Sequence, residues 1–319
     1  MTRTSERPSA KPPLVIINPR AGSGAGHDRF RHVEHELLDH FGDLAVLFTD
    51  ARGDAEDATR DALEQGTKDI IVVGGDGTIN EVVNGWFQGE GEPLSEDARL
   101  ILLGGGTGSD FVRSLGLGGE HGTLDALRAG RTRRVDVGSV RCQELEGRGV
   151  VTRRFVNIAS FGLSSLANTE VEKFSAMGGT IAYAAATALS LLGWSNPLVR
   201  VTYSGPSEAP RAYEGPVVVG AFANGRYFGS GMMMAPDAQL DDGLMDLVLV
   251  GDLRRRDVVR FARHLYDGTH VEHPAVTVAQ SPMVDVEGPY SVMIEADGDV
   301  CGRLPAQFTI QPKALQVVA

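Results

Sequence analysis

The chain has 319 residues, of which 42% are hydrophobic and 23% are charged, so it can bury globular cores and has room for two domains. Its formal net charge of −12 excludes a general nucleic-acid binder and gives no overall attraction to anionic lipids. Only two cysteines are present, Cys142 and Cys301, which excludes a disulfide framework and is typical of a reducing compartment. We therefore expect a cytoplasmic protein.

The first part of the chain predicts a disordered tail and then alternating strands and helices. Residues 1–13 match neither a signal peptide nor a lipidation signal. Predicted strands cover residues 14–17, 44–48, 70–73 and 100–103, and predicted helices cover residues 27–41, 55–65, 79–87, 110–115 and 123–129. This alternation predicts an α/β domain over residues 14–133, with a parallel sheet that binds ligands beyond the carboxyl ends of its strands.

From Arg134 the pattern changes to short apolar runs separated by turn residues. Predicted strands cover residues 135–140, 155–158, 199–203, 217–223, 245–250, 290–295 and 307–311, and predicted helices cover residues 175–192 and 253–264. We interpret residues 134–319 as a mostly β domain, a sandwich, whose last residues could pack back on the first domain. The longest nearly apolar stretch, residues 181–194, is shorter than the about 20 residues of a membrane span, so we expect a soluble or peripheral protein.

The most informative segment is the turn that follows the apolar run 70–73. It reads Gly74-Gly75-Asp76-Gly77-Thr78-Ile79-Asn80-Glu81. Its glycines allow a sharp bend that brings backbone N–H groups close to a ligand, and a helix N-terminus in this place is a natural phosphate site. Because Asp76 would repel a bare phosphate, the turn implies a bridging Mg²⁺ or a nucleotide–metal complex. The segment therefore indicates phosphoryl transfer.

Two further glycine loops follow predicted strands. Loop 18–26 lacks both the lysine of a P-loop and the G-x-G-x-x-G spacing, so a flexible connector explains it equally well. Loop 104–109 adds the hydroxyl of Thr107 and, at the next helix start, the carboxylate of Asp110. The alternative is that Ser109 or Asp110 only caps this helix. Two loops that each combine Thr and Asp favour a functional site, and all three loops should share one edge of the sheet.

Two acidic clusters stand in the second half of the chain. Residues 236–244 carry three aspartates at a turn and could bind a hard cation, although an acidic hairpin turn is the simpler explanation. The run Glu295-Ala296-Asp297-Gly298-Asp299 places three carboxylates at a strand end. Like charges this close raise the proton affinity of one member or recruit a metal, and a hairpin with Asp-Gly at its turn is the alternative.

Taken together, these segments resemble the bacterial diacylglycerol kinase-like lipid kinases, relatives of the sphingosine kinases and of eukaryotic diacylglycerol kinase catalytic domains. Six segments match in family order: Asn18-Pro19 with Gly22 and Gly24, residues 74–81, residues 106–111, residues 224–231, residues 236–244, and Asp297-Gly298-Asp299. The resemblance implies a three-layer, NAD kinase-like α/β domain and a C-terminal β-sandwich, with the active site in a cleft between them. It also implies Mg-ATP as donor and a lipid hydroxyl as acceptor, foremost that of diacylglycerol.

The resemblance further assigns roles to matching residues. The positions that match nucleotide contacts are Asn18, Thr49, Gly74, Gly75, Asp76, Gly77, Thr78, Asn80, Gly106 and Thr107. Asp297 matches the general base, and we expect Asp76 and Asp110 to position the catalytic Mg²⁺. Gln239, Asp242 and Leu244 match a structural Mg²⁺ site with one carboxylate and two backbone carbonyls, to which Asp299 provides a link. Asp299 stands where the family usually has Glu, and Ser109 where it usually has Asn.

Several alternatives remain open at this stage. The acceptor could be another lipid, such as a sphingoid base or phosphatidylglycerol. The Gly-Gly-Asp-Gly-Thr turn also occurs in NAD kinases, and a non-catalytic regulator that binds nucleotide or lipid would keep the same motifs. Arg131, Arg133 and Arg134, or residues 254–256, could contact anionic headgroups at a membrane, or could be solvated faces. A homodimer is an open option, and no nucleic-acid partner is expected.

Overall fold

The computed structural model describes residues 11–21, 26–89, 91–103, 109–165, 194–206, 208–229, 231–254, 257–258 and 261–319. These residues form two compact units. Unit 1 contains the described residues up to 103 together with 120–133 and 316–319, and unit 2 contains 109–119 and 134–315. Because both units are discontinuous along the chain, the domain limits expected from the sequence stay predictions.

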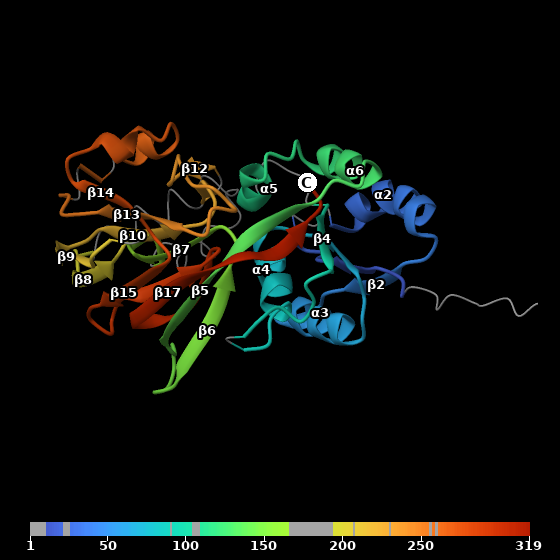
Figure 1. Ribbon diagram of the computed structural model, residues 1–319, viewed down its shortest axis with the longest axis horizontal. Helices are drawn as coiled ribbons and strands as arrows, with labels where there is room; N and C mark the ends of the chain where they lie inside the picture. The colour runs from blue at the N-terminus through green and yellow to red at the C-terminus, as the bar shows by residue number, and fades with distance from the viewer. Residues whose placement is uncertain are drawn as a thin grey trace, which may run out of the picture. The chain divides into compact units, whose positions relative to one another are not determined.

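Unit 1 is a parallel sheet between two layers of helices. Its elements are β1 (Leu14–Ile17), α2 (Gly26–Phe41), β2 (Ala45–Phe48), α3 (Asp54–Glu64), β3 (Asp69–Val73), α4 (Asp76–Gly85), β4 (Arg99–Leu102) and α6 (Glu120–Arg128). The strands lie in the order β2-β1-β3-β4, and each neighbouring pair is parallel. In Figure 1, α2 and α6 lie on one face of this sheet, and α3 and α4 lie on the other. The three-layer α/β prediction is confirmed.

The cores of unit 1 follow from its apolar runs. A parallel strand covered on both faces is apolar throughout, and four of the five residues of β3 are buried. Side chains from α2 and α6, among them Phe30, Leu37 and Leu124, pack on one face against Ile17 and Val73. Burial of each such side chain contributes roughly 1.5–3 kcal/mol, so packing, rather than helix propensity, holds these short helices on the sheet.

Unit 2 is mostly antiparallel β structure. Its strands are β5 (Arg133–Gln143), β6 (Val150–Phe155), β7 (Ile158–Gly162), β8 (Leu198–Tyr203), β9 (Arg211–Pro216), β10 (Val219–Ala223), β11 (Tyr227–Phe228), β12 (Met232–Met233), β13 (Met245–Val250), β14 (Val276–Ser281), β15 (Met283–Glu287), β16 (Met293–Ala296) and β17 (Asp299–Val317). Its described residues include the helix α5 (Asp110–Ser114) and the 3-10 helices η2 (Ala262–Leu265) and η3 (Thr269–Glu272). Figure 1 shows the long β17 running through this part of the chain.

Two branches of strands meet at β17 and enclose the main core of unit 2. One branch runs β14-β13-β10-β7-β16-β17, and in the other β17 pairs with β15, which leads to β8 and β9. Side chains from both branches, including Phe161, Phe222, Val284 and Phe308, form one buried cluster. The rings of Phe222 and Phe308 stack with their centroids 3.9 Å apart. The predicted β-sandwich is therefore confirmed.

Several predicted elements differ in detail. The predicted strand 155–158 is the junction between β6 and β7, and the predicted strand 307–311 is only the middle of β17. β9, β14 and β15 were not predicted. Within the predicted helix 253–264, residues 253 and 254 are not helical, residues 257, 258 and 261 are helical, and a 3-10 helix begins at Ala262. The predicted helix 175–192 lies outside the described residues.

Candidate active site

The carboxyl ends of the strands in unit 1 meet at one edge. Asn18 follows β1, Thr49 follows β2 and Gly74 follows β3, and these three strands are parallel and in register at their ends. The backbone N–H of Thr49 donates to the Ile17 carbonyl at 2.9 Å, which continues the strand pairing to the edge. Two of the three glycine loops expected at one edge, 18–26 and 74–78, therefore begin there, and the place of loop 104–109 stays a prediction. Residues 22–25 and 104–108, with the predicted contacts Gly106 and Thr107, lie outside the described residues.

Asn18 connects the end of β1 to the glycine turn. Its backbone N–H donates to the Val73 carbonyl at 3.0 Å, and its side-chain Nδ2 donates to Thr78 Oγ1 at 3.1 Å. A Cβ on Gly74 would lie 2.7 Å from the Cβ and Oγ1 atoms of Thr78, so only glycine allows the threonine to pack there. The structure thus brings together three of the residues predicted to contact nucleotide.

The start of α4 has the features of a phosphate-binding turn. The residue before α4 is Gly75, which has no side chain to cap the helix, while Ile79 N–H already donates to the Gly75 carbonyl at 3.1 Å. The N–H groups of the first turn of a helix otherwise have no partner within the helix, and they attract anions. Gly77 is exposed and Asp76 is half-buried at this helix start. The arrangement can bind a phosphate group through backbone atoms.

Asn80 takes a different place from the other predicted contacts. It is buried on α4, and Nδ2 of Asn84 donates to its carbonyl at 2.8 Å and to its Oδ1 at 3.1 Å. This side chain therefore interacts along the helix, and its predicted contact with nucleotide stays a prediction.

In unit 2, the turn between β16 and β17 carries Asp297. Asp297 has φ 49° and Gly298 has φ 92°, and Ala296 pairs with Asp299 across them, which fits a two-residue Asp-Gly hairpin. The Asp297 carboxylate accepts three backbone N–H groups of the β6–β7 junction: Oδ2 from Val156 at 2.8 Å, and Oδ1 from Asn157 at 2.9 Å and from Ile158 at 3.0 Å. Backbone donors thus fix the orientation of the predicted base.

Asn157 links this junction to two other family-matching segments. Its Oδ1 accepts the Ser114 hydroxyl of α5 at 3.0 Å, and its Nδ2 donates to the Tyr227 carbonyl. A Cβ on Gly225 would lie 1.9 Å from the same Oδ1, so glycine is required beside Asn157. The sequence analysis did not select Asn157; its only signal is a polar residue interrupting an apolar run.

Asp110 belongs to the same neighbourhood in unit 2. It is buried, and its Oδ1 forms an ion pair with the Arg113 guanidinium at 3.4 Å, which in turn lies over the Tyr227 ring at 5.3 Å. Ser109 caps α5 by accepting the Val112 N–H at 3.5 Å, as in the alternative considered for this segment. Asp110 therefore lies in a packed network with α5 and β11, and its predicted contact with Mg²⁺ stays a prediction.

The residues predicted to form a structural Mg²⁺ site lie at the turn before β13. Gln239 and Asp242 are exposed, and the Leu244 N–H donates to Asp242 Oδ1 at 3.0 Å. Beneath them, the buried Asp136 accepts the Gly243 N–H at 2.7 Å. Burial raises the pKa of Asp136, and the neighbouring charges of Asp242 and Asp241 raise it further.

Concentrated negative charge and oxygen ligands at this turn fit a hard cation. Within the described residues, however, no three His, Cys, Asp or Glu side chains gather into a group that could hold a metal ion. A site with one carboxylate and two backbone carbonyls would not form such a group. The Mg²⁺ assignment of Gln239, Asp242, Leu244 and the half-buried Asp299 stays a prediction.

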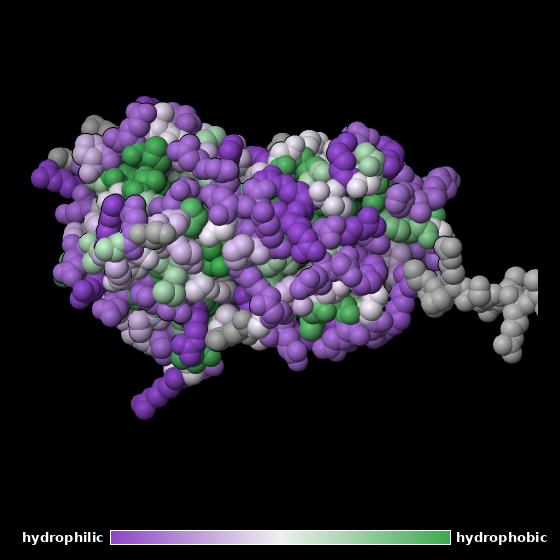
Figure 2. Space-filling model, viewed as in Figure 1, coloured by the Kyte–Doolittle hydropathy of each residue, from purple (hydrophilic) through white to green (hydrophobic). Residues whose placement is uncertain are grey.

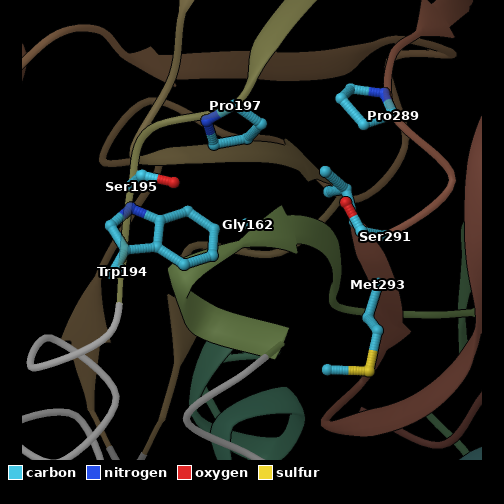
Figure 3. A pocket seen from close by; sticks show the side chains of 8 residues that line it. Gly162, Trp194, Ser195, Pro197, Pro289, Ser291 and Met293 are labelled. Atoms are coloured by element: carbon cyan, nitrogen blue, oxygen red, sulfur yellow. The ribbon is translucent and has the colours of Figure 1, made fainter.

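A pocket of about 290 Å³ opens in unit 2 at the end of the β7–β16 pair that is opposite Asp297. Figure 3 shows Trp194 and Pro197 facing Ser291 and Met293 across it. Its wall mixes apolar side chains with two serines, so it can accommodate a molecule that has both apolar and polar parts.

One face of the molecule carries its hydrophobic residues in separate places (Figure 2). On the face seen in Figure 2, hydrophilic residues predominate and the hydrophobic residues form small patches. No helix among the described residues is both long and apolar enough to cross a bilayer. Arg131 and Arg134, for which membrane contact and a solvated face were both open, are exposed.

A parallel α/β unit with a glycine turn at a helix start and a β-sandwich unit with an Asp-Gly turn are the two parts that the resemblance to diacylglycerol kinase-like proteins implies. Comparison with family models agrees. Residues 12–140 match the diacylglycerol kinase catalytic domain, and residues 157–319 match the YegS C-terminal NAD kinase beta sandwich-like domain. The chain therefore belongs to the diacylglycerol kinase-like lipid kinase family, and the resemblance seen in the sequence is confirmed.

Named relatives cover nearly the whole chain. A diacylglycerol kinase of Mycobacterium tuberculosis (strain CDC 1551 / Oshkosh) is 28% identical over 311 residues, which are 95% of this chain and 94% of the relative. A protein named "Probable lipid kinase YegS-like" from Pseudomonas aeruginosa (strain UCBPP-PA14) is 28% identical over 95% of this chain and 93% of its own. A solved structure titled "Crystal structure of a putative diacylglycerol kinase from Bacillus anthracis str. Sterne" has the same fold, with a TM-score of 0.74, 24% identity and 96% of both chains covered.

Proposed function

We propose that this protein is an ATP- and Mg²⁺-dependent lipid kinase that transfers the γ-phosphate of ATP to a lipid hydroxyl, foremost that of diacylglycerol, giving phosphatidic acid. The observation that carries the proposal is the glycine turn at the start of α4, which Asn18 holds through Thr78. Membership of a kinase family implies ATP as the donor. The names of the relatives support a lipid acceptor.

The proposal assigns donor binding to backbone groups of unit 1. The N–H groups of residues 74–78 hold the phosphates, and the Asn18–Thr78 hydrogen bond keeps the turn in the shape that presents them. Asp76 and Asp110 are the carboxylates assigned to Mg²⁺. When bound, Mg²⁺ neutralises charge that develops on the transferring phosphoryl group.

The proposal assigns proton acceptance to Asp297. Its carboxylate accepts the proton of the lipid hydroxyl as that oxygen attacks the γ-phosphate. The N–H groups of Val156, Asn157 and Ile158 keep the carboxylate from rotating, and orientation of this kind lowers the barrier of a positioned reaction. The pocket beside Trp194 and Met293 is a candidate for an apolar part of the acceptor.

The proposal also includes a peripheral contact with the membrane that presents the lipid. Each exposed arginine would contribute about 1 kcal/mol at an anionic surface. The candidates are Arg131 and Arg134, or Arg254 of the run 254–256. The exchange of Arg131 for Gln should weaken sedimentation with anionic vesicles and leave binding to neutral vesicles unchanged. Equal binding to both kinds of vesicle before and after the exchange would rule out this contact.

The decisive experiment incubates the protein with labelled ATP, Mg²⁺ and either diacylglycerol micelles, a total lipid extract or NAD. We expect labelled phosphatidic acid from the micelles and no labelled NADP. Asp297→Asn and Asp76→Asn should lose most of this activity. The control Glu287→Gln, which removes the charge of an exposed glutamate on β15, should keep it. Label in another lipid of the extract would change the acceptor assignment, and label in NADP or in no product would refute the proposal.

A further inference from the structure

Glu295 is a buried carboxyl group that the proposed reaction does not use. It lies on β16, two residues before Asp297, and its side chain is only 2% exposed. The hydroxyl of Ser160 donates to Glu295 Oε1, and the hydroxyls of Ser160 and Ser164 are 2.8 Å apart. A carboxyl group in this position is costly to bury unless hydrogen bonds or protonation compensate, so its presence needs an explanation.

The Glu295–Ser160 contact lies on the same strand pair that holds Asp297. In the antiparallel pair β16–β7, Glu295 is opposite Ser160 and Ala296 is opposite Ala159. At the next position, the Asp297 N–H donates to the Ile158 carbonyl at 2.9 Å, and the Asp297 carboxylate accepts the Ile158 N–H. The Glu295–Ser160 contact therefore lies two residues along β7 from Ile158, which orients Asp297.

The surroundings of Glu295 favour its neutral form. Burial raises its pKa to about 7, and the charges of Asp297 on the turn and Asp299 on β17 raise it too, while the hydroxyls of Ser160 and Ser164 oppose the shift. Among the described residues, Cys301 on β17 is another titratable group that interacts with it, and Cys301 is also influenced by Arg153 of β6. An ionised Glu295 would therefore add a buried negative charge beside two other carboxylates.

We propose that Glu295 is a positioning residue: its side chain joins β16 to β7 through Ser160 and so keeps the Asp297 turn in place, and the buried negative charge that its ionisation adds beside Asp297 weakens the site as the pH rises. This inference rests on the proposed kinase function and adds an upper pH limit to it. The limit arises because a charged Glu295 repels Asp297 and Asp299 and opposes the approach of the negatively charged phosphate.

The test compares the pH dependence of kcat and KM for diacylglycerol in the wild-type protein, Glu295→Gln and the exposed control Glu287→Gln. Glutamine keeps the size and the acceptor oxygen of Glu295 but cannot ionise. We expect wild-type kcat to fall above neutral pH, by at most about tenfold per pH unit, while KM changes little. Glu287→Gln should show the same fall, and Glu295→Gln should not. The same alkaline fall in Glu295→Gln would overturn the proposal.

A second variant keeps the proposal testable if Glu295→Gln fails to fold. Ser160→Ala removes a hydrogen bond that favours the ionised form of Glu295, so the alkaline fall in kcat should move to higher pH. A fall at unchanged or lower pH in this variant would contradict the role of Glu295.

A readout that needs no activity separates this inference from the proposed function. The thermal unfolding temperature of the wild-type protein should fall between about pH 5 and pH 8 by more than that of Glu295→Gln. If no lipid is phosphorylated, the proposed function fails, and the unfolding data alone still decide whether Glu295 ionises in this range. Parallel pH dependences in the two proteins would refute the inference even if the kinase activity is found.

Discussion

At the scale of single residues, polar groups hold the segments of unit 2 in position through hydrogen bonds to residues far away in the sequence. Asn157 alone bonds α5 through Ser114, β11 through Tyr227 and the β16–β17 turn through Asp297. A buried amide that loses such partners costs about 1–3 kcal/mol for each unsatisfied group. Asn157 therefore stabilises the position of three segments at once.

The glycine beside Asn157 gives the first prediction. Gly225→Ala would place a Cβ 1.9 Å from Asn157 Oδ1 and 2.8 Å from Ser114 Oγ, so the amide must move and its hydrogen bonds weaken. We expect a loss of about 1–3 kcal/mol in the free energy of unfolding, measured by urea denaturation. Gly118→Ala, where a Cβ meets nothing within 4 Å, is the control in the same unit and should change stability little. Equal stability of the two variants would contradict the packing described here.

Glu295 gives a prediction about stability and pH. Its pKa is about 7 in the folded protein and near 4.5 in the unfolded chain, so the folded state holds the proton more tightly. Its stabilising contribution is fully present below about pH 4.5 and is lost as the pH rises through 7, a total of roughly 3 kcal/mol.

Glu295→Gln lacks this loss, because glutamine does not titrate. Relative to the wild-type protein, its free energy of unfolding should therefore rise between about pH 5 and pH 8, which urea denaturation at both values would measure. If the difference in the free energy of unfolding between the two proteins is the same at pH 5 and pH 8, the pKa of Glu295 in the folded protein is not raised.

At the scale of elements, the start of α4 separates two roles of glycine. Gly74 is needed for packing, since its Cβ would collide with Thr78, whereas a Cβ on Gly77 would meet nothing within 4 Å. Gly77 stands in the first turn of a helix, where alanine is intrinsically favoured by up to about 1 kcal/mol. Under the proposed function, this open position lets a phosphate approach the backbone.

Two alanine variants test this distinction. Gly74→Ala should lower the thermal unfolding temperature without nucleotide, because Thr78 must shift and its bond with Asn18 is disturbed. Gly77→Ala should keep or slightly raise that temperature and yet weaken ATP binding, measured by calorimetric titration. Wild-type ATP affinity in Gly77→Ala would argue against a phosphate at this helix start.

Elements differ in how far the sequence predicts them. The strands of unit 1 were predicted to within one residue at each end, because parallel strands covered on both faces are continuous apolar runs. In unit 2, β9 was missed because its residues are mostly polar and it pairs only with β8. β17 was predicted as five residues because Pro305 and Pro312, which usually end strands, lie within its 19 residues.

The candidate site likewise contains residues that the sequence predicts and residues that it does not. Each of the two turns, the glycine turn and the Asp-Gly turn, is a continuous run of residues. The residue types in each run alone indicated phosphate and acid chemistry. Asn157 and Ser160 act through pairing between strands, and only the register of β7 with β16 places Ser160 opposite Glu295. Sequence patterns contain no information on such a register, so these residues could not be selected in advance.

At the scale of the whole molecule, β17 is part of both compact units. Its residues up to 315 belong to unit 2, and residues 316–319 belong to unit 1, where Gln316 and Val317 pair in parallel with β4. Val317 and Val318 are almost completely buried, and the Val318 N–H donates to the Leu100 carbonyl at 2.9 Å. Residues 316–319, which follow unit 2 in the sequence, thus add to the sheet of unit 1.

Deletion of residues 316–319 should therefore destabilise unit 1 rather than unit 2. Loss of two buried valines removes about 3–6 kcal/mol of apolar burial, and the Leu100 carbonyl loses its donor as well. Because each unit has its own core, calorimetry should show the transition of unit 1 at a lower temperature and that of unit 2 almost unchanged. Deletion of the half-buried Ala319 alone should move neither transition. If the larger deletion shifts both transitions together, the two units unfold as one cooperative body, and β17 is the covalent element that couples them.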